Sequence, residues 1–96
     1  MRPFAKSHNT AFRLLTVLLY GLESNLPYLT DLGQAGRHRR LALRSGACAY
    51  SMRMTIPRMR EHLEWLSEIG LVFALVYEKG QIQLSVKLPI GAPSNA

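Results

Sequence analysis

The amino-acid sequence predicts an α+β fold in which three helices are followed by a two-stranded antiparallel β-hairpin. Three patterns support this prediction. Apolar residues recur at helical intervals in residues 56–69, and apolar and polar residues alternate in residues 81–88, as in a strand with one buried face. A strongly apolar run at residues 11–22 supplies another helix. With 96 residues, the chain has enough material for one hydrophobic core and not for two.

The first predicted helix covers about residues 11–22. Asn9 or Thr10 can cap it, because either side chain accepts a backbone N–H of the first turn. Its broad apolar surface predicts a position in the core or in a dimer interface. The run is too short to span a bilayer and no small-residue cleavage site follows it, so a cytoplasmic domain is favoured over a secretion signal. Residues 1–8 are expected to be a flexible basic lead.

The middle of the chain carries mixed signals. A proline and two glycines interrupt residues 26–36, which predicts a loop, with a short strand or a turn of helix as the alternative. Residues 37–45 are predicted to form the second helix, because two leucines lie among four arginines and a glycine follows. Residues 47–54 either extend that helix or form the turn behind it.

The third predicted helix begins after Thr55. Proline follows at position 57, where it is tolerated because the missing N–H of a first helical turn has no partner anyway. Gly70 suits the left-handed residue that ends a helix. A single apolar stripe runs between these points and consists of Ile56, Met59, Leu63, Leu66 and Ile69.

Two strands are predicted after this helix, at residues 71–77 and 81–88. The connection Glu78-Lys79-Gly80 is short and contains a glycine, which suits a β-hairpin. Pro89 ends the sheet, and residues 90–96 are expected to be a flexible tail. The prediction is therefore a single domain at residues 9–89.

Positive charge is concentrated in one part of the chain. Residues 32–60 contain seven arginines and no acidic residue. Residues 1–60 carry a net charge of +8 and residues 61–96 one of −2, which together give the +6 of the whole chain. Cations without balancing acids indicate a surface that faces a polyanion, and we expect nucleic acid.

The residue pattern argues against several classes of site. The single cysteine, Cys48, cannot form an internal disulfide and is expected to be a small, partly buried residue. His8, His38 and His62 are scattered, and no Cys or His spacing resembles a metal site. The sequence has neither a phosphate-cradling glycine loop nor an obvious carboxylate pair for acid–base chemistry. We therefore expect no enzyme, no metal and no cofactor.

The segment from His62 to Val72 carries a resemblance. It reads His-Leu-Glu-Trp-Leu-Ser-Glu-Ile-Gly-Leu-Val and runs straight into the predicted hairpin around Gly80. A third helix ending in this HLxxLxxxGLV pattern, followed by a wing, resembles the winged helix-turn-helix superfamily of DNA-binding domains. The resemblance covers about residues 37–88. One departure is that Leu41-Ala42 lies twenty-one residues before His62-Leu63, which implies a longer second helix or an expanded turn.

The resemblance implies that the third helix enters the major groove by its amino-terminal half. Thr55, Arg58 and Glu61 are then expected to face base edges or nearby phosphates. Arg58 is chemically suited to bidentate contact with O6 and N7 of guanine. The competing interpretation is a solvated Arg58 side chain that pairs with Glu61 or Glu64 of the same helix.

Phosphate contacts require only positive charge and reach, so they are expected from the surrounding polar and cationic residues. Arg37, Arg39, Arg40 and Arg44 are expected to approach from the second helix, Arg53 from the turn, Arg60 from the groove wall, and Lys79 and Gln81 from the wing tip. Together these residues are expected to form one electropositive surface from which the third helix projects. Tyr50 and Trp65 are candidates for base stacking in a single-strand binder, although packing is the expected role of Trp65.

The function implied is sequence-specific binding of double-stranded DNA, by a small transcriptional repressor that acts as a homodimer. A dimer is expected because one small module contacts too little DNA for tight specific binding. Two alternatives stay open. One is a winged helix used for protein interaction or as an accessory module in replication or a mobile element, and the other is an RNA-binding domain.

Overall fold

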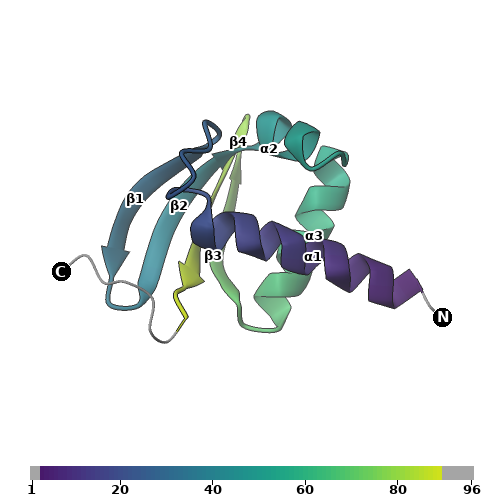
Figure 1. The fold of residues 1–96 in the computed structure, drawn as a ribbon, viewed down its shortest axis with the longest axis horizontal. Coiled ribbons are helices and arrows are strands. Elements are labelled where there is room, and N and C mark those ends of the chain that lie inside the picture. The colour runs from purple at the N-terminus through teal and green to yellow at the C-terminus, as the bar shows by residue number, and fades with distance from the viewer. Residues whose placement is uncertain (1–2, 90–96) are drawn as a thin grey trace.

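The computed structural model describes the backbone of residues 3–89 and the side chains of residues 8–89. These residues form three α-helices and one four-stranded antiparallel sheet (Figure 1). In chain order the elements are α1 (Pro3–Tyr20), β1 (Leu29–Ala35), β2 (His38–Arg44), α2 (Ser45–Ser51), α3 (Ile56–Glu68), β3 (Val72–Glu78) and β4 (Gln81–Lys87).

The chain is α+β, but the predicted order of elements and the predicted size of the sheet are wrong. The β1–β2 hairpin lies between the first and second helices, so the helices do not simply precede the sheet. The described sheet has four strands instead of two, in the order β1-β2-β4-β3. The C-terminal strand β4 therefore lies between β2 and β3 and joins the two hairpins into one sheet.

Strand β2 occupies most of the segment that was predicted to be the second helix. Leu41 and Leu43 are buried in the core, whereas Arg40 and Arg44 are exposed. Alternation of this kind has the period of a strand, because successive side chains of a strand point to opposite faces. Each residue of β2 pairs with a residue of β4, a partner far along the chain that the local pattern does not reveal.

The segments on either side of β2 also differ from the prediction. The predicted loop at residues 26–36 contains β1, which is the alternative that the sequence left open, with a bulge between Asp31 and Gly33. Gly46 lies within α2 instead of ending a helix, and residues 52–55 form a short turn before α3. The long spacing ahead of His62 therefore comes from a strand and a short helix, and not from an expanded turn.

Helix α1 begins at Pro3, so the backbone of residues 3–8, predicted to be a flexible lead, is helical. The predicted tail at residues 90–96 lies outside the described residues. At the other end of α1, Gly21 donates its N–H to the carbonyl of Val17 at 2.7 Å. A Cβ at Gly21 would collide with that carbonyl and with the Leu29 side chain, so glycine allows the chain to turn tightly from α1 toward β1.

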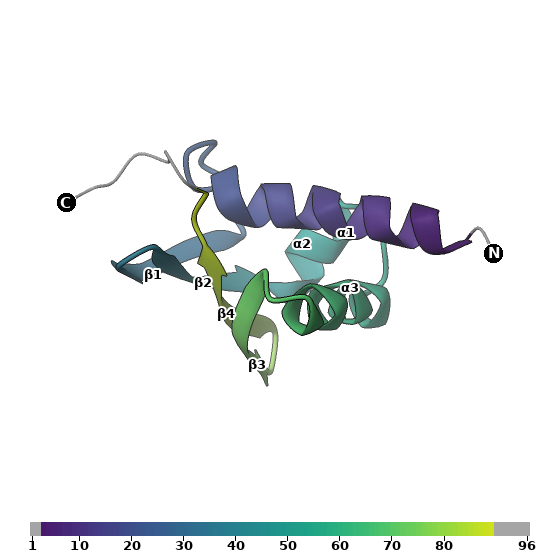
Figure 2. The same ribbon diagram turned by 90° about the horizontal axis from the view of Figure 1, so that it is seen from below.

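The hydrophobic core lies between the helices and one face of the sheet. Its fully buried side chains come from every layer and include Leu14, Leu18, Leu41, Leu43, Cys48, Met59, Leu63, Leu66, Ile82 and Val86. Figures 1 and 2 show α1 crossing over α3, with its C-terminal end reaching the sheet. Cys48 is part of this core, and burial raises the pKa of its thiol to about 11, which keeps it protonated.

The α3 helix and the hairpin behind it agree with the sequence-based prediction. Thr55 caps α3, its side-chain oxygen accepting the backbone N–H of Arg58 at 3.2 Å. Gly70 has φ +81°, the left-handed conformation expected of a residue that ends a helix. The β3–β4 hairpin turns at Lys79 and Gly80, with Gly80 at φ +78°.

Candidate nucleic-acid interface

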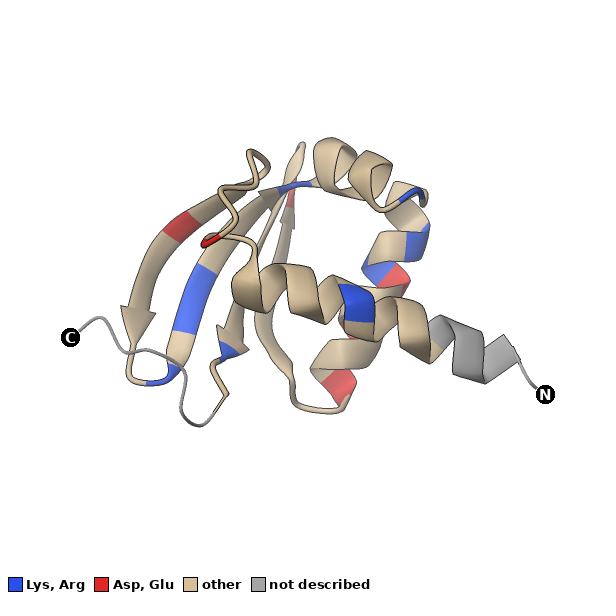
Figure 3. Cartoon of the chain, viewed as in Figure 1, with Lys and Arg blue, Asp and Glu red and all other residues tan. Residues whose placement is uncertain are grey.

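The first turn of α3 faces solvent. Ile56, Pro57 and Arg58 are exposed, while Met59 is fully buried and holds this end of the helix against the core. The first turn contains no acidic residue. Figure 3 shows basic residues in this half of α3 with an acidic residue beside them, and acidic residues toward the other end of the helix. The amino-terminal half of α3 is therefore accessible, and it carries two arginines, Arg58 and Arg60, against one acidic residue, Glu61.

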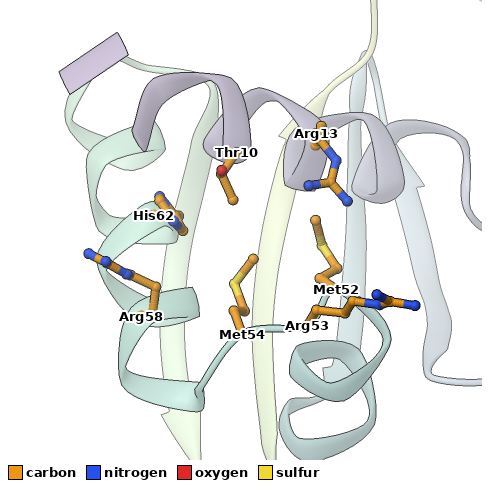
Figure 4. Close-up of a pocket in the computed structure, with 7 residues that line it drawn as sticks. All are labelled: Thr10, Arg13, Met52, Arg53, Met54, Arg58 and His62. Carbon is orange, nitrogen blue, oxygen red and sulfur yellow. The ribbon is translucent and has the colours of Figure 1, made fainter. Parts of the chain in front are cut away.

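A cleft lies beside the start of α3, between α1, the turn before α3, and α3 itself. It has a volume of about 360 Å³ and is lined by Thr10, Arg13, Met52, Arg53, Met54, Arg58 and His62. In Figure 4 the two methionines occupy the middle of the view, Arg13 reaches down from α1, and Arg53 and Arg58 point outward on opposite sides. Three guanidinium groups thus border a cleft with an apolar centre and could each contact a phosphate.

Arg58 pairs with Glu61 across one turn of α3, at an N–O distance of 3.5 Å. The two side chains are 61% and 68% exposed. An exposed ion pair of this kind contributes less than about 1 kcal/mol, because water screens it and both side chains lose freedom. The Glu61 contact is therefore compatible with Arg58 binding a phosphate or a base instead.

Arg60 lies on the side of α3 that faces the hairpin. Its guanidinium carbon is 4.0 Å from the ring centroid of Tyr77 on β3, a cation–π contact. The Tyr77 hydroxyl donates to Glu64 Oε2 at 3.1 Å. Burial, together with the Glu64 carboxylate, raises the pKa of Tyr77 to about 12, so this hydroxyl stays protonated. These contacts connect the basic part of α3 to β3.

His62 lies beneath the cleft and is buried. Burial lowers its pKa below the usual 6.5, and the nearby charge of Arg58 lowers it further. The imidazole is therefore neutral at pH 7 and adds no charge to the cleft. In the part of the chain that the structure describes, no group of three or more His, Cys, Asp or Glu side chains is arranged to hold a metal ion.

The remaining predicted phosphate ligands do not gather around α3. Arg39 is buried, with a guanidinium N–H donated to Gln34 Oε1 at 3.5 Å, and Arg37 donates to the Leu88 carbonyl at 2.8 Å. Arg40 and Arg44 are exposed on the sheet face that points away from the core. The expected single electropositive surface therefore does not form, because strand geometry sends neighbouring arginines to opposite faces.

The two predicted wing-tip residues lie on the hairpin. Lys79 is exposed at the turn, and Gln81 donates its side-chain amide to Glu78 Oε1 at 2.8 Å. Thr55 and Glu61 are both exposed at the amino-terminal half of α3, although the Thr55 hydroxyl oxygen already serves as the helix cap. Of the predicted residues, Arg53 and Arg58 are brought together at the cleft, with Thr55 and Glu61 exposed on the same end of α3, whereas Arg60 lies on the side of α3 that faces the hairpin.

Sequence reasoning missed Arg13. It lies more than a turn inside α1, and only the packing of α1 against α3 carries it to the cleft beside Arg53 and Arg58. No local signal marks it, because its neighbours in the sequence are the apolar residues of α1.

Two further findings complete the description. Among the described residues, no helix has the length and apolar character needed to cross a membrane. Comparison of the chain with protein-family models, with curated proteins and with solved structures finds no match.

Proposed function

We propose that the chain binds double-stranded DNA with the amino-terminal half of α3 in the major groove. The supporting observation is the exposed, acid-free first turn of α3. Arg13 from α1, Arg53 from the turn and Arg58 from α3 lie at the cleft on one side of it, and Arg60 lies on the side that faces the hairpin. An exposed helix end with cations on both sides fits groove entry combined with phosphate contacts.

The arrangement around α3 is consistent with a relative of the winged helix-turn-helix proteins. A turn of four residues joins α2 to α3, and the β3–β4 hairpin follows α3 directly, in the place where a wing is found. The additional strand β1 extends the sheet on the side away from β3. It therefore leaves α3 and its hairpin free to approach a duplex.

Each residue has a distinct proposed role. Arg58 reads a guanine, since its fork of donors matches O6 and N7, and Glu61 faces a neighbouring base edge or restrains Arg58. Arg13, Arg53 and Arg60 contact phosphates and set the position of α3. Three such contacts give a slope of log affinity against log salt concentration of about −2.7.

We further propose that the chain acts in the cytoplasm as a homodimeric transcriptional repressor that excludes polymerase from an operator. Two copies allow paired half-sites to be read, which one module of this size does poorly. Phe12 and Tyr20 are exposed aromatic residues of α1 and offer apolar surface for such a dimer.

Selection from a random duplex library, followed by fluorescence anisotropy at two salt concentrations, tests this function. The expected result is a preferred sequence with an inverted repeat, bound by a dimer that sedimentation detects. Arg58→Ala should weaken binding to that sequence and relax the preference, while Arg40→Ala, which removes an equal charge from the sheet, should not. Equal affinity for all duplexes, lost at physiological salt, would contradict specific regulation.

A further inference from the structure

The face of the sheet that points away from the core is not covered by any described element. In Figure 2 the helices lie above or beside the sheet, and its other side is open. The outward residues of the three strands β2, β4 and β3 include His38, Arg40, Ala42 and Arg44, then Gln81, Gln83, Ser85 and Lys87, and then Phe73, Val76 and Glu78. Ala42 is buried but is not part of the core cluster, as expected of a small residue beneath longer neighbours.

A bulge in β3 adds apolar surface to this open face. The pairing of β3 with β4 skips between Phe73 and Val76, and Ala74 within the skip has φ +56°. Without the bulge, residues three apart would point to opposite faces of the sheet. The left-handed conformation of Ala74 costs energy for a residue with a Cβ, so the surrounding structure holds it in place.

An aromatic pair results from this geometry. The rings of His38 and Phe73 meet edge to face with their centroids 4.9 Å apart. They come from β2 and β3, which are separated by β4, so they meet above β4. The residue of β4 opposite Phe73 is Ser85, whose small side chain leaves room for the rings. Both rings are half-buried, and so part of each remains accessible to a ligand.

Cations surround the pair. On β2, Arg40 is paired with Ser85 of β4, and Lys87 of β4 is paired with His38. Arg44 lies further from the pair, four residues beyond Arg40 on β2 with Ala42 between them, and all three cations are exposed. Glu78 is the acidic residue at the end of this face. Its Oε1 accepts hydrogen bonds from Gln81 at 2.8 Å and Gln83 at 3.4 Å. The end of the open face at His38, Arg40 and Lys87 is therefore cationic and aromatic, and Glu78 lies at the opposite end, in the same row as Arg44.

We propose that this open face binds a single-stranded nucleic acid. Bases stack on the His38–Phe73 pair, and the phosphates next to them meet Arg40 and Lys87, while Arg44, further along β2, meets a more distant phosphate. A single strand exposes the flat faces of its bases, which a duplex hides, and aromatic rings between cations on a sheet suit that chemistry. An acidic protein would match the charge but would leave the ring pair unused. The site is separate from α3 and does not depend on the function proposed above.

Fluorescence anisotropy with the full chain tests this proposal. The probes are labelled single strands of DNA and of RNA, each about 12 nucleotides long, with a duplex of the same sequence for comparison. Phe73→Leu keeps an apolar side chain but removes the ring, and should weaken single-strand binding about ten-fold. Arg40→Gln combined with Lys87→Gln should lower the salt slope for single strands by about 1.4, since two phosphate contacts are lost.

Arg58→Gln is the matched control, because it removes one charge from the α3 surface and leaves the sheet intact. We expect it to weaken duplex binding alone, and the sheet variants to weaken single-strand binding alone. The double charge variant changes only exposed side chains, so it keeps the test valid if Phe73→Leu lowers the melting temperature. Absence of single-strand binding, or binding that only Arg58→Gln reduces, would overturn the proposal. A preference for RNA or DNA probes identifies which single strand is the ligand.

Discussion

The arginines of α3 and those of β2 belong to one continuous basic block, yet the structure uses them differently. Arg58 and Arg60 belong to helix α3, which is anchored in the core by the buried Met59 between them, so both arginines are exposed in the amino-terminal half of the helix. On β2, Arg39 is buried at 6% exposure, whereas Arg40 is exposed on the other face. The comparison teaches that a cluster of charge in the sequence forms one surface only when the local period allows it.

The strongest loss of stability is predicted for the buried face of β2, and almost none for its exposed face. Leu41→Ala removes a fully buried side chain and should lower the free energy of unfolding by about 2–5 kcal/mol, because it leaves a cavity. Arg40→Ala, at the next position, should change it by less than about 0.5 kcal/mol. Urea unfolding followed by circular dichroism measures both. Similar losses in the two variants would show that β2 does not divide core from solvent.

The second effect concerns binding and compares α3 with β2. Arg58→Ala should reduce the free energy of binding to the selected duplex by about 1–3 kcal/mol, because the bidentate contact with guanine is lost. Arg39→Met should leave duplex binding unchanged, since this arginine is buried away from any ligand. Titration by anisotropy measures both. A loss with Arg39→Met alone would move the binding surface from α3 to the sheet.

The third effect is a gain in stability at the same buried position. The Nε of Arg39 has no hydrogen-bond partner, and a buried charge with incomplete partners costs free energy. Methionine keeps much of the length of the side chain without the charge, so Arg39→Met should raise the free energy of unfolding by about 1 kcal/mol. Urea unfolding is the measurement. A clear loss instead would mean that the bond to Gln34 outweighs the burial of the charge.

The smallest effect is a pH dependence near α3. The folded-state pKa of His62 lies below its unfolded value of 6.5, so the unfolded chain binds the proton more readily. His62 therefore lowers stability as pH falls through 6.5 toward the folded pKa, and has no such effect above that range. Arg58 and His8 oppose its protonation, while Glu61 favours it. Between pH 7 and pH 5 the melting temperature should fall further for the natural chain than for His62→Gln. An equal fall in both would show that His62 does not cause the loss of stability at low pH.

Local signals explain which elements were predicted correctly. Thr55, Pro57 and Gly70 mark both ends of α3 through the chemistry of caps and turns, and each acts within a few residues of its own position. The β3–β4 hairpin likewise needs only the alternation of β4 and a short turn. By contrast, the run around Leu41 and Leu43 was misread as a helix. The two leucines are two residues apart, which is the spacing of a strand, but so short a run among arginines gives only a weak periodic signal.

The candidate site residues also fall into two groups: those that local sequence signals locate, and those that tertiary packing brings together. The exposed start of α3, with Arg58 and Glu61, follows from helix periodicity, so sequence reasoning located it. The meeting of Arg13 with Arg53 depends on how α1 packs across α3, and the meeting of His38 with Phe73 depends on the bulge at Ala74 and on strand order. None of these follows from spacing along the chain.

By itself, the sequence determined the third helix, its caps, the hairpin behind it and the excess of positive charge, because each depends on residues close together in the chain. Only the tertiary structure decided that residues 38–44 form a strand, that the sheet has four strands, and on which face each arginine lies. The physical reason is that a strand is stabilised by hydrogen bonds to its neighbour, and β4, the neighbour that β2 requires, is supplied by the far end of the chain.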